Sequence, residues 1–343
     1  SGCEVQGVRK RTRRRRGPDM IGTSWIREQG LKDALLVEAL RRRNMDSVPL
    51  WSRKVPARDD CMKAWDDMTP LRDGPVNPDR VEVTDEQAMA DRIKAYAAEL
   101  GGTLTGMTEL KPEFIEYGVE IAHKNVICVV CYEDYSASLV GPDAVDLEAM
   151  STYVDCARIS TEIARYIREE LGYAAVAHHN GSVQIQAIPV MWQVGFGELG
   201  KHGSLINPDI GANFRPGIIT TDLPVAYDEP IEFGVQDYCM TCNLCANNCP
   251  GDAIPADSSQ YVVTDGQKRW LTDIDKCYPI SRFRDEYCHI CIDVCPYIQK
   301  ENGLPERKTM YKTYMKERKA EGYKTPKTNK ARVDDDAPGT VSA

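Results

Sequence analysis

The sequence lacks an apolar run long enough to cross a membrane as a helix. Its longest uninterrupted apolar run, Val126 to Tyr132, is far shorter than the ~20 residues that a membrane-spanning helix needs. Glycine and proline account for only 25 and 20 of the 343 residues, and 42% of all residues are hydrophobic. Such a composition excludes a low-complexity chain and a disordered one. We therefore expect a soluble globular protein with about two domains.

Cysteine is also too sparse for a scaffold held together by disulfides. The 13 cysteines make up about 4% of the chain, and their number is odd. Eight of them lie between Cys239 and Cys295. The other five are scattered, at Cys3, Cys61, Cys128, Cys131 and Cys156. This clustering favours metal binding in a compartment that keeps thiols reduced, rather than disulfide formation.

Positive charge is concentrated towards the two ends of the chain. Residues 9–16 carry seven basic side chains, and residues 307–332 carry ten basic and two acidic ones. These segments contribute +7 and +8 to a total of −9, so the remaining body has a net charge of −24. Such a body is a poor general surface for nucleic acids, and no nucleic-acid partner is expected. No apolar segment of the kind found in export signals follows the arginine run, which favours a cytoplasmic location.

Strand and helix patterns alternate between residues 61 and 230. Residues 125–132 form an apolar, β-branched run that is typical of a buried central strand. Residues 147–171 place isoleucines on one stripe of a helix, which Gly172 ends. Further strands are expected at residues 174–177 and 183–190. This alternation predicts an α/β domain.

Two further helices are expected nearer the N-terminus. Residues 31–42 have helical periodicity, and Thr84 and Gln87 form a capping-box pattern that opens another helix. The expected division of the chain has four parts. These are a basic extension (1–60), the α/β domain (61–230), a cysteine-rich module (231–305), and a basic, partly disordered tail (306–343).

The strongest motif is a run of four cysteines followed by a second, incomplete run. The first begins at Cys239 with the spacing C-x2-C-x2-C-x3-C-P, and the second begins at Cys288 and lacks one cysteine, which Cys277 can supply. In bacterial two-cluster ferredoxins, the fourth cysteine of such a run binds the other cluster. This rule predicts two [4Fe–4S] clusters in a ferredoxin-like module. One set of ligands is Cys239, Cys242, Cys245 and Cys295, and the other is Cys249, Cys277, Cys288 and Cys291.

Two alternatives for the cysteines are less consistent with their spacing. Zinc sites use paired Cys-x2–4-Cys knuckles, whereas this run has the spacing of an iron–sulfur cluster. Cys128 and Cys131 have the spacing of a redox motif, but on a strand their thiols point to opposite or offset faces. We expect those two to be buried apolar side chains. The long domain before the module indicates that the clusters deliver electrons to a site within it.

A glycine-rich segment lies between the α/β pattern and the cysteine run. Residues 195–203 read GFGELGKHG, with four glycines and a lysine in nine residues. Such a backbone can approach a large flat or anionic ligand closely, although a glycine-rich loop is often only a turn. The candidate cofactor-binding residues are Gly195, Gly197, Glu198, Gly200, His202 and Gly203.

These motifs together resemble the corrinoid-dependent reductive dehalogenases. The resemblance covers about residues 125–300 and includes the segments LGY (171–173), GFGELGKHGSLINPDIG (195–211), TTDLP (220–224), the cysteine run, KCY (276–278) and CHICIDVCPY (288–297). A related enzyme that modifies transfer RNA, epoxyqueuosine reductase, shares the cluster and corrinoid layout. It usually has Trp-Ile-Gly-Lys-Asn where this chain has Glu-Leu-Gly-Lys-His.

The resemblance implies an α/β (α+β) corrinoid-binding domain of the nitroreductase-like type, followed by the two-cluster module. It further implies a cobalamin-type cofactor bound base-off, which leaves cobalt accessible to reduction to Co(I). The sequence has no Asp-x-His-x-x-Gly signature for a histidine lower ligand. In such an enzyme the protein supplies electrons, a dry pocket and a proton.

Three residues match the family's catalytic positions. Tyr153 matches the tyrosine that donates a proton to the carbon losing halide, and Lys201 matches its cationic partner. Asn180 is a third pocket candidate. A phenol with an ordinary pKa of ~10 is a poor acid at pH 7, and a nearby cation stabilises its phenolate. A tyrosine near a helix start also serves commonly in packing, and an asparagine in a turn.

The expected reaction is therefore reductive dehalogenation, in which R–X, two electrons and a proton give R–H and halide. A lysine at 201 points towards halogenated aromatics or phenols as substrates. The electrons would come from an external ferredoxin, flavodoxin or reductase, and residues 307–332 would form part of its docking patch. The alternatives are an epoxyqueuosine-reductase-like enzyme acting on transfer RNA and a corrinoid-free electron carrier of the ferredoxin type.

Overall fold

The fold is taken from a computed structural model of the chain, which describes most of the region between residues 56 and 298. The described residues are 8–10, 56–116, 118–179, 184–264, 266–274, 276–277, 281 and 287–298. The expected helix at 31–42, the tail at 306–343 and Asn180 lie outside them. Helix α2 (Pro56–Met68) spans the expected boundary at residue 60.

A four-stranded sheet forms the centre of the larger domain. Its strand order is β2 (Leu104–Glu109), β4 (Asn125–Tyr132), β8 (Phe214–Thr221) and β5 (Ala175–His178), and every neighbouring pair is antiparallel. Because β4 and β5 are both antiparallel to β8, they run parallel to each other, with α5 (Pro142–Glu169) connecting them. The alternation of strand and helix in the sequence thus reflects a crossover from β4 through α5 to β5, and β8 lies between these two strands in the sheet.

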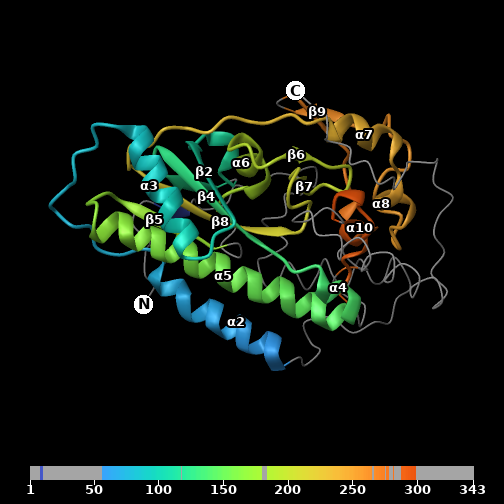
Figure 1. The fold of residues 1–343 in the computed structure, drawn as a ribbon, viewed down its shortest axis with the longest axis horizontal. Coiled ribbons are helices and arrows are strands. Elements are labelled where there is room, and N and C mark those ends of the chain that lie inside the picture. Colours follow the sequence, from blue (N-terminus) through green and yellow to red (C-terminus); the bar gives the residue numbers. More distant parts are fainter. Residues whose placement is uncertain are drawn as a thin grey trace.

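Both faces of this sheet are covered, which explains why β4 is apolar throughout. Ile127, Val129 and Cys131 pack with α5 and with α3 (Glu86–Glu99) on one face. Val126 and Cys128 pack with α6 (Ala187–Gln193) on the other. Figure 1 shows α5 running the length of the sheet, with α2 beside it. The prediction that Cys128 and Cys131 are buried on different faces is confirmed.

Several helix ends differ from the expected ones. Asp85 rather than Thr84 caps α3, because its carboxylate accepts hydrogen bonds from the backbone N–H groups of Gln87 and Ala88, both at 3.0 Å. Helix α5 begins earlier than expected, at Pro142. Its end at Gly172 is confirmed: φ is +73°, and a Cβ there would lie 2.7 Å from the carbonyl oxygen of Asp79.

The strand expected at 183–190 is wrong, because α6 occupies residues 187–193. Short apolar runs do not distinguish a strand from a buried helix by periodicity, and Val190 and Met191 are buried in either case.

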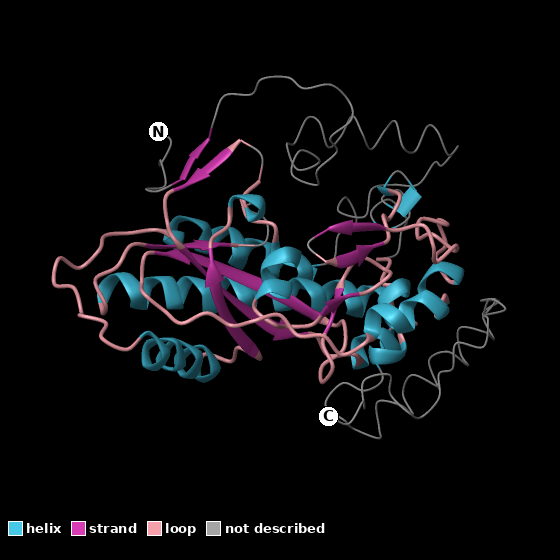
Figure 2. Ribbon diagram, turned by 90° about the horizontal axis from the view of Figure 1, so that it is seen from above, coloured by secondary structure: helices cyan, strands magenta, loops and turns pink. Residues whose placement is uncertain are grey.

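The cysteine module consists of short elements beyond one end of the sheet. Figure 1 shows α7, α8 and α10 gathered there, next to the start of α5, and Figure 2 shows the same separation from above. The remaining elements are η3 (Thr69–Arg72), η4 (Pro112–Phe114), β1 (Val8–Lys10), β3 (Val119–Ile121), α4 (Ser136–Val140), β6 (Glu198–Leu199), β7 (Leu205–Ile206), α7 (Val235–Thr241), α8 (Leu244–Asn247), β9 (Val262–Thr264), β10 (Gln267–Arg269) and α10 (Ile290–Asp293). Among the described residues, no helix combines the length and apolarity needed to span a membrane.

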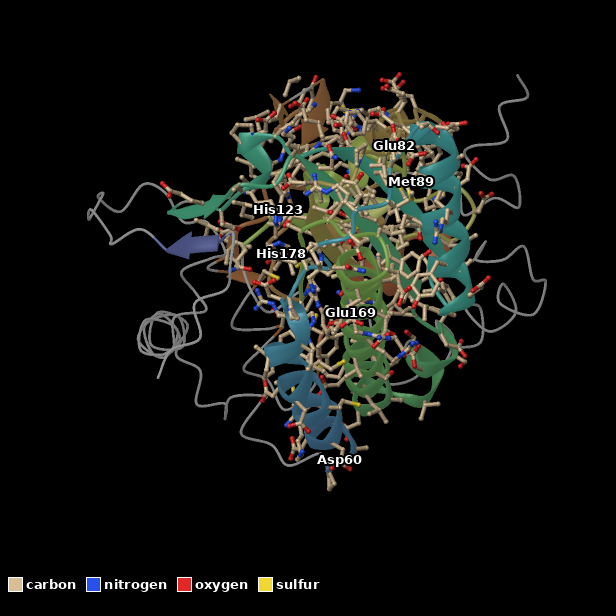
Figure 3. All side chains as sticks on the ribbon, turned by 90° about the vertical axis from the view of Figure 1, so that its left-hand side faces the viewer. Asp60, Glu82, Met89, His123, Glu169 and His178 are labelled. Atoms are coloured by element: carbon tan, nitrogen blue, oxygen red, sulfur yellow. The ribbon has the colours of Figure 1, made fainter. Side chains whose placement is uncertain are left out.

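Three histidines lie in a buried polar cluster at the end of the sheet away from the module. The Thr220 hydroxyl lies 2.8 Å from both His123 Nδ1 and His178 Nε2, and His179 Nε2 lies 2.8 Å from the Thr161 hydroxyl. Figure 3 shows His123 and His178 next to each other. Burial, together with the charge of Arg72, lowers the pKa of His178 to about 3 and that of His179 to about 4.

These histidines predict a loss of stability in mild acid. Unfolded histidines bind protons below a pKa of ~6.5, whereas His178 and His179 stay neutral in the folded protein down to about pH 4. Their contribution to stability is therefore complete above pH 6.5 and is lost as the pH falls. We expect the free energy of unfolding to drop by about 4 kcal/mol between pH 7 and pH 5, which urea unfolding would measure.

The matched control for this pH effect is His179→Gln, in which the drop should shrink by about 2 kcal/mol, the contribution of one histidine. An equal drop in both proteins would assign the acid sensitivity to other groups.

Candidate functional site

Four cysteines line one pocket where the module meets the larger domain. They are Cys239, Cys242, Cys245 and Cys295, the four that the ferredoxin rule places together. The other residues lining this pocket are His202, Ile206, Tyr238, Leu244, Pro296 and Tyr297. All four cysteines are buried. Residues 239–245 and residue 295 are thus brought together although they are about 50 positions apart in the sequence.

The chemistry of these thiols fits an iron–sulfur cluster. Burial raises the pKa of the Cys239 thiol to about 12, so a thiolate there needs a compensating positive charge such as iron provides. Backbone N–H groups donate hydrogen bonds to three of the sulfurs: Lys201 to Cys239, Leu244 to Cys242, and Tyr297 to Cys295. Such N–H···S bonds help to set the properties of protein-bound clusters.

The other four cysteines form a second group next to the first. Cys288 and Cys291 both interact electrostatically with Cys277 and Cys249. Burial raises the pKa of the Cys288 thiol to about 11, and the backbone N–H of Ala253 donates to Cys249 Sγ at 3.3 Å. Cys291 also interacts with Cys245 of the first group. The two groups therefore adjoin, as an electron path requires.

Tyr153 lies on α5, near the end of the sheet that faces the module. The guanidinium carbon of Arg215 lies 5.0 Å from the centre of the Tyr153 ring. Arg215 Nε donates a hydrogen bond to Glu133 Oε1 at 2.5 Å. Although burial opposes it, the carboxylate of Glu133 raises the pKa of Arg215 well above its ordinary value, so the guanidinium is always charged.

The cation over Tyr153 is thus Arg215, whereas the expected partner is Lys201. Arg215 is the second residue of β8 and lies directly opposite Cys131 of β4, which brings it to the face that α5 covers. Its signal in the sequence is faint: a single charged residue near the start of an otherwise apolar strand, FRPGIITT. A role for Lys201 beside Tyr153, and the preference for halogenated phenols inferred from it, stay predictions.

Glu133 connects the Tyr153 site to the cysteine module. Its second carboxylate oxygen lies 4.0 Å from His289 Nε2, and His289 Nδ1 lies 3.1 Å from the Asp293 carboxylate. Asp293 also accepts a hydrogen bond from the Ser138 hydroxyl at 2.8 Å. His289 and Asp293 both lie within the segment that carries Cys288, Cys291 and Cys295, so these polar contacts fix the module against the sheet.

The glycine-rich segment folds back on the chain itself. A Cβ at Gly195 would collide with the carbonyl oxygen of Glu229, and one at Gly197 with that of Ile206. Gly200 packs on Ile206 and His202, and Gly203 lies next to Thr272. These contacts give the glycines a packing role in the hairpin of β6 and β7, and direct contact with a cofactor stays a prediction.

The polar residues of the same segment face the cysteine module. The Glu198 carboxylate accepts hydrogen bonds from the backbone N–H groups of Phe233 and Val235, at 2.7 and 3.2 Å, and so holds the start of α7. Lys201 is fully buried, and its ammonium donates hydrogen bonds to Asn243 and Ser258. Asn243 lies within the first cysteine run, and Ser258 follows that run in the chain. Asn180 lies outside the described residues.

Comparison with known proteins first defines the class of the module. The family described as "4Fe-4S dicluster domain" matches residues 238–298, the segment that contains both cysteine groups.

The chain is also similar to curated proteins beyond the cysteine module. A tetrachloroethene reductive dehalogenase of Desulfitobacterium hafniense is 28% identical over 211 residues, covering 59% of this chain and 38% of that protein. The tetrachloroethene reductive dehalogenase of Sulfurospirillum multivorans is 33% identical over 140 residues, or 39% of this chain and 27% of that protein. The epoxyqueuosine reductase of Cyclobacterium marinum is 34% identical over 150 residues, or 40% and 44%.

Solved structures agree on the fold. The catabolic reductive dehalogenase NpRdhA in complex with 3-bromo-4-hydroxybenzoic acid covers 80% of this chain with a TM-score of 0.66 and 23% identity. The expected resemblance to reductive dehalogenases, which are oxidoreductases, is thus confirmed. The chain spans less than half the length of these relatives: the match covers 38% of the Desulfitobacterium hafniense enzyme and 42% of NpRdhA.

Proposed function

We propose that this protein is a reductive dehalogenase that removes halide from an organohalide with electrons from two [4Fe–4S] clusters and a corrinoid. One observation carries the proposal: a tyrosine held under a charged arginine, at the end of the sheet that meets eight grouped cysteines. A proton donor and an electron supply are the two things that replacing halogen by hydrogen needs. Similarity to reductive dehalogenases over 59% of the chain supports the same conclusion.

The donor sets support the proposed cofactors. Each cysteine group has four thiols, the number that a [4Fe–4S] cluster needs. Base-off binding of the corrinoid is proposed from the similarity to reductive dehalogenases and from the lack of an Asp-x-His-x-x-Gly signature in the sequence. When bound, a corrinoid supplies a strongly reducing metal centre. Asn180 and the 195–203 segment are the proposed corrinoid and substrate contacts.

In this proposal Tyr153 is the proton donor. Its hydroxyl donates a proton to the carbon that loses halide, and Arg215 stabilises the phenolate that remains. Glu133 holds the guanidinium in place and keeps it charged. Glu133 and Arg215 thus place a fixed positive charge beside the Tyr153 phenol. Because this charge is already in position, it does not have to move during the reaction.

Arg215 gives a prediction that separates its charge from its packing. We expect Arg215→Gln to lower kcat for halide release by at least about tenfold, because phenolate stabilisation is lost and Glu133 is left unpaired. Arg215→Lys, which keeps a cation next to Glu133, should restore part of the rate. Equal rates in the two variants, measured at equal cluster content, would show that the charge does not matter.

The proposed function itself is tested with anaerobically purified protein reconstituted with iron, sulfide and cobalamin. We expect halide release from at least one member of a panel of halogenated phenols and chlorinated ethenes, with a reduced viologen as electron donor. Protein that carries both cofactors and releases no halide from any of them would contradict the proposal.

The second candidate is an epoxyqueuosine-reductase-like activity, favoured by the 34% identity to the enzyme of Cyclobacterium marinum. Such an enzyme needs a basic surface for transfer RNA. The total charge of this chain is −9, to which residues 9–16 and 307–332 contribute +7 and +8. The rest of the chain therefore has a net charge of −24, which argues against this activity. Salt-sensitive retention of transfer RNA by the purified protein would favour this alternative. A protein that binds clusters but no corrinoid would instead be an electron carrier.

A further inference from the structure

Lys201 is a buried ammonium with a complete set of acceptors. It has no exposed surface, and Nζ donates to Asn243 Oδ1, to the Ser258 hydroxyl oxygen at 2.8 Å and to the Ala256 carbonyl oxygen at 3.5 Å. The Ser258 hydroxyl donates its own hydrogen bond to Asn243 Oδ1 at 3.3 Å, so its oxygen can accept the hydrogen bond from Lys201. Three N–H donors thus meet three acceptors, which favours the charged form, although burial lowers the pKa of this ammonium.

This charge lies next to one cysteine group. The side chain interacts electrostatically with Cys245, Cys239 and Cys242, all members of the first group. The backbone N–H of Lys201 also donates to the Cys239 sulfur. Asn243, which fixes the ammonium, lies between Cys242 and Cys245 in the chain, so charge and ligands are held by one loop.

His202 contributes an N–H group, which carries a partial positive charge, to the same pocket. Its Nδ1 accepts a hydrogen bond from the Ser204 backbone N–H at 3.1 Å, so the ring proton lies on Nε2. Among the described residues, this buried Nε2 has no partner. The ring lines the pocket together with the four cysteines and is only 8% exposed. The unpaired N–H therefore belongs to a wall of the space that the cluster would fill.

We propose that Lys201 and His202 raise the reduction potential of the cluster bound by the first cysteine group, Lys201 through its charge and His202 through an N–H···S hydrogen bond. This inference rests on the proposed function, since it needs that cluster. Reduction adds one electron from the external donor and no proton, which makes the cluster more negative. A fixed cation and an N–H donor stabilise this reduced form more than the oxidised one.

The test is a redox titration of the reconstituted holoprotein, with each cluster followed by electron paramagnetic resonance. We expect Lys201→Met to lower the reduction equilibrium constant of one cluster at least tenfold, a shift of 59 mV to more negative potential for a one-electron couple. His202→Phe should shift the same cluster in the same direction by a smaller factor. The second cluster should keep its potential in both variants and so serves as an internal reference.

Two control variants separate charge from structure. Lys201→Arg keeps the cation and should keep the cluster close to its original potential. Lys268→Met removes the same charge from the module at a more exposed site, where the ammonium is paired with Asp237 at 2.9 Å. We expect no shift there, because exposed ion pairs are strongly screened.

The outcomes distinguish this inference from the proposed function. Unaltered protein that binds no clusters would overturn the proposed function. Clusters with unchanged potentials in Lys201→Met and His202→Phe, or equal shifts of both clusters, would overturn the inference alone. If Lys201→Met fails to hold its cluster, His202→Phe decides: an unchanged potential contradicts the inference and a negative shift supports it.

Discussion

Tyr153→Phe is expected to lower kcat for halide release by about 10²–10⁴-fold, the usual contribution of a positioned general acid. The substitution removes one hydroxyl and keeps the ring under the Arg215 guanidinium, so packing on α5 is preserved. Iron, sulfide and corrinoid content should therefore match those of the unaltered protein. The measurement is halide release per corrinoid-loaded protein with a chemical reductant, which bypasses the natural electron donor.

Tyr166→Phe is the matched control for this experiment. Tyr166 lies on the same helix, and an arginine also stands over its ring: Arg92 is 5.4 Å from the ring centre and its Nε donates to the Tyr166 hydroxyl at 2.6 Å. It lies far from the cysteine module, next to α3, so activity should be unchanged. Full activity in Tyr153→Phe would exclude this tyrosine as the proton donor.

Cys295→Ala is expected to abolish halide release by removing one cluster of the two. Cys295 is the member of its group that comes from the distant end of the module, so its loss leaves three ligands from the segment 239–245. Bound iron should fall from about eight to about four atoms per chain. Because metal binding contributes directly to folding, the variant should also unfold at a lower temperature.

Cys61→Ala is the control for the loss of a thiol. Cys61 lies on α2, away from both groups, and is half-buried, so iron content and activity should be unchanged. Cys249→Ala should remove the cluster of the second cysteine group. The electron paramagnetic resonance signal of the first cluster, which Lys201 is proposed to influence, should remain. Full iron content in Cys295→Ala would show that the cysteines are divided differently between the clusters.

Features with a local physical signature could be predicted from the sequence. The strand at 125–132 follows from burial on both faces, and the helix ending at Gly172 follows from a stripe of isoleucines and a left-handed glycine. The expected grouping of the eight cysteines rests on spacing alone, because a [4Fe–4S] cluster would impose a fixed geometry on its ligands.

Features that depend on tertiary neighbours could not be predicted in this way. Residues 187–193 are apolar enough for a strand or a helix, and packing on the sheet selects the helix. Arg215 meets Tyr153 only because β8 pairs with β4 in one register and α5 crosses that face. The contacts of Lys201 with Asn243 and Ser258 likewise depend on how the chain folds around the first cysteine group.

The polar chain from Ser138 through Asp293 and His289 to Glu133 also bears on how the protein matures. Two of its four members, His289 and Asp293, lie in the segment that carries Cys288, Cys291 and Cys295. Glu133 in turn positions Arg215. Binding of the clusters during maturation would therefore also hold Glu133 and Arg215 in place beside Tyr153, the proposed proton donor.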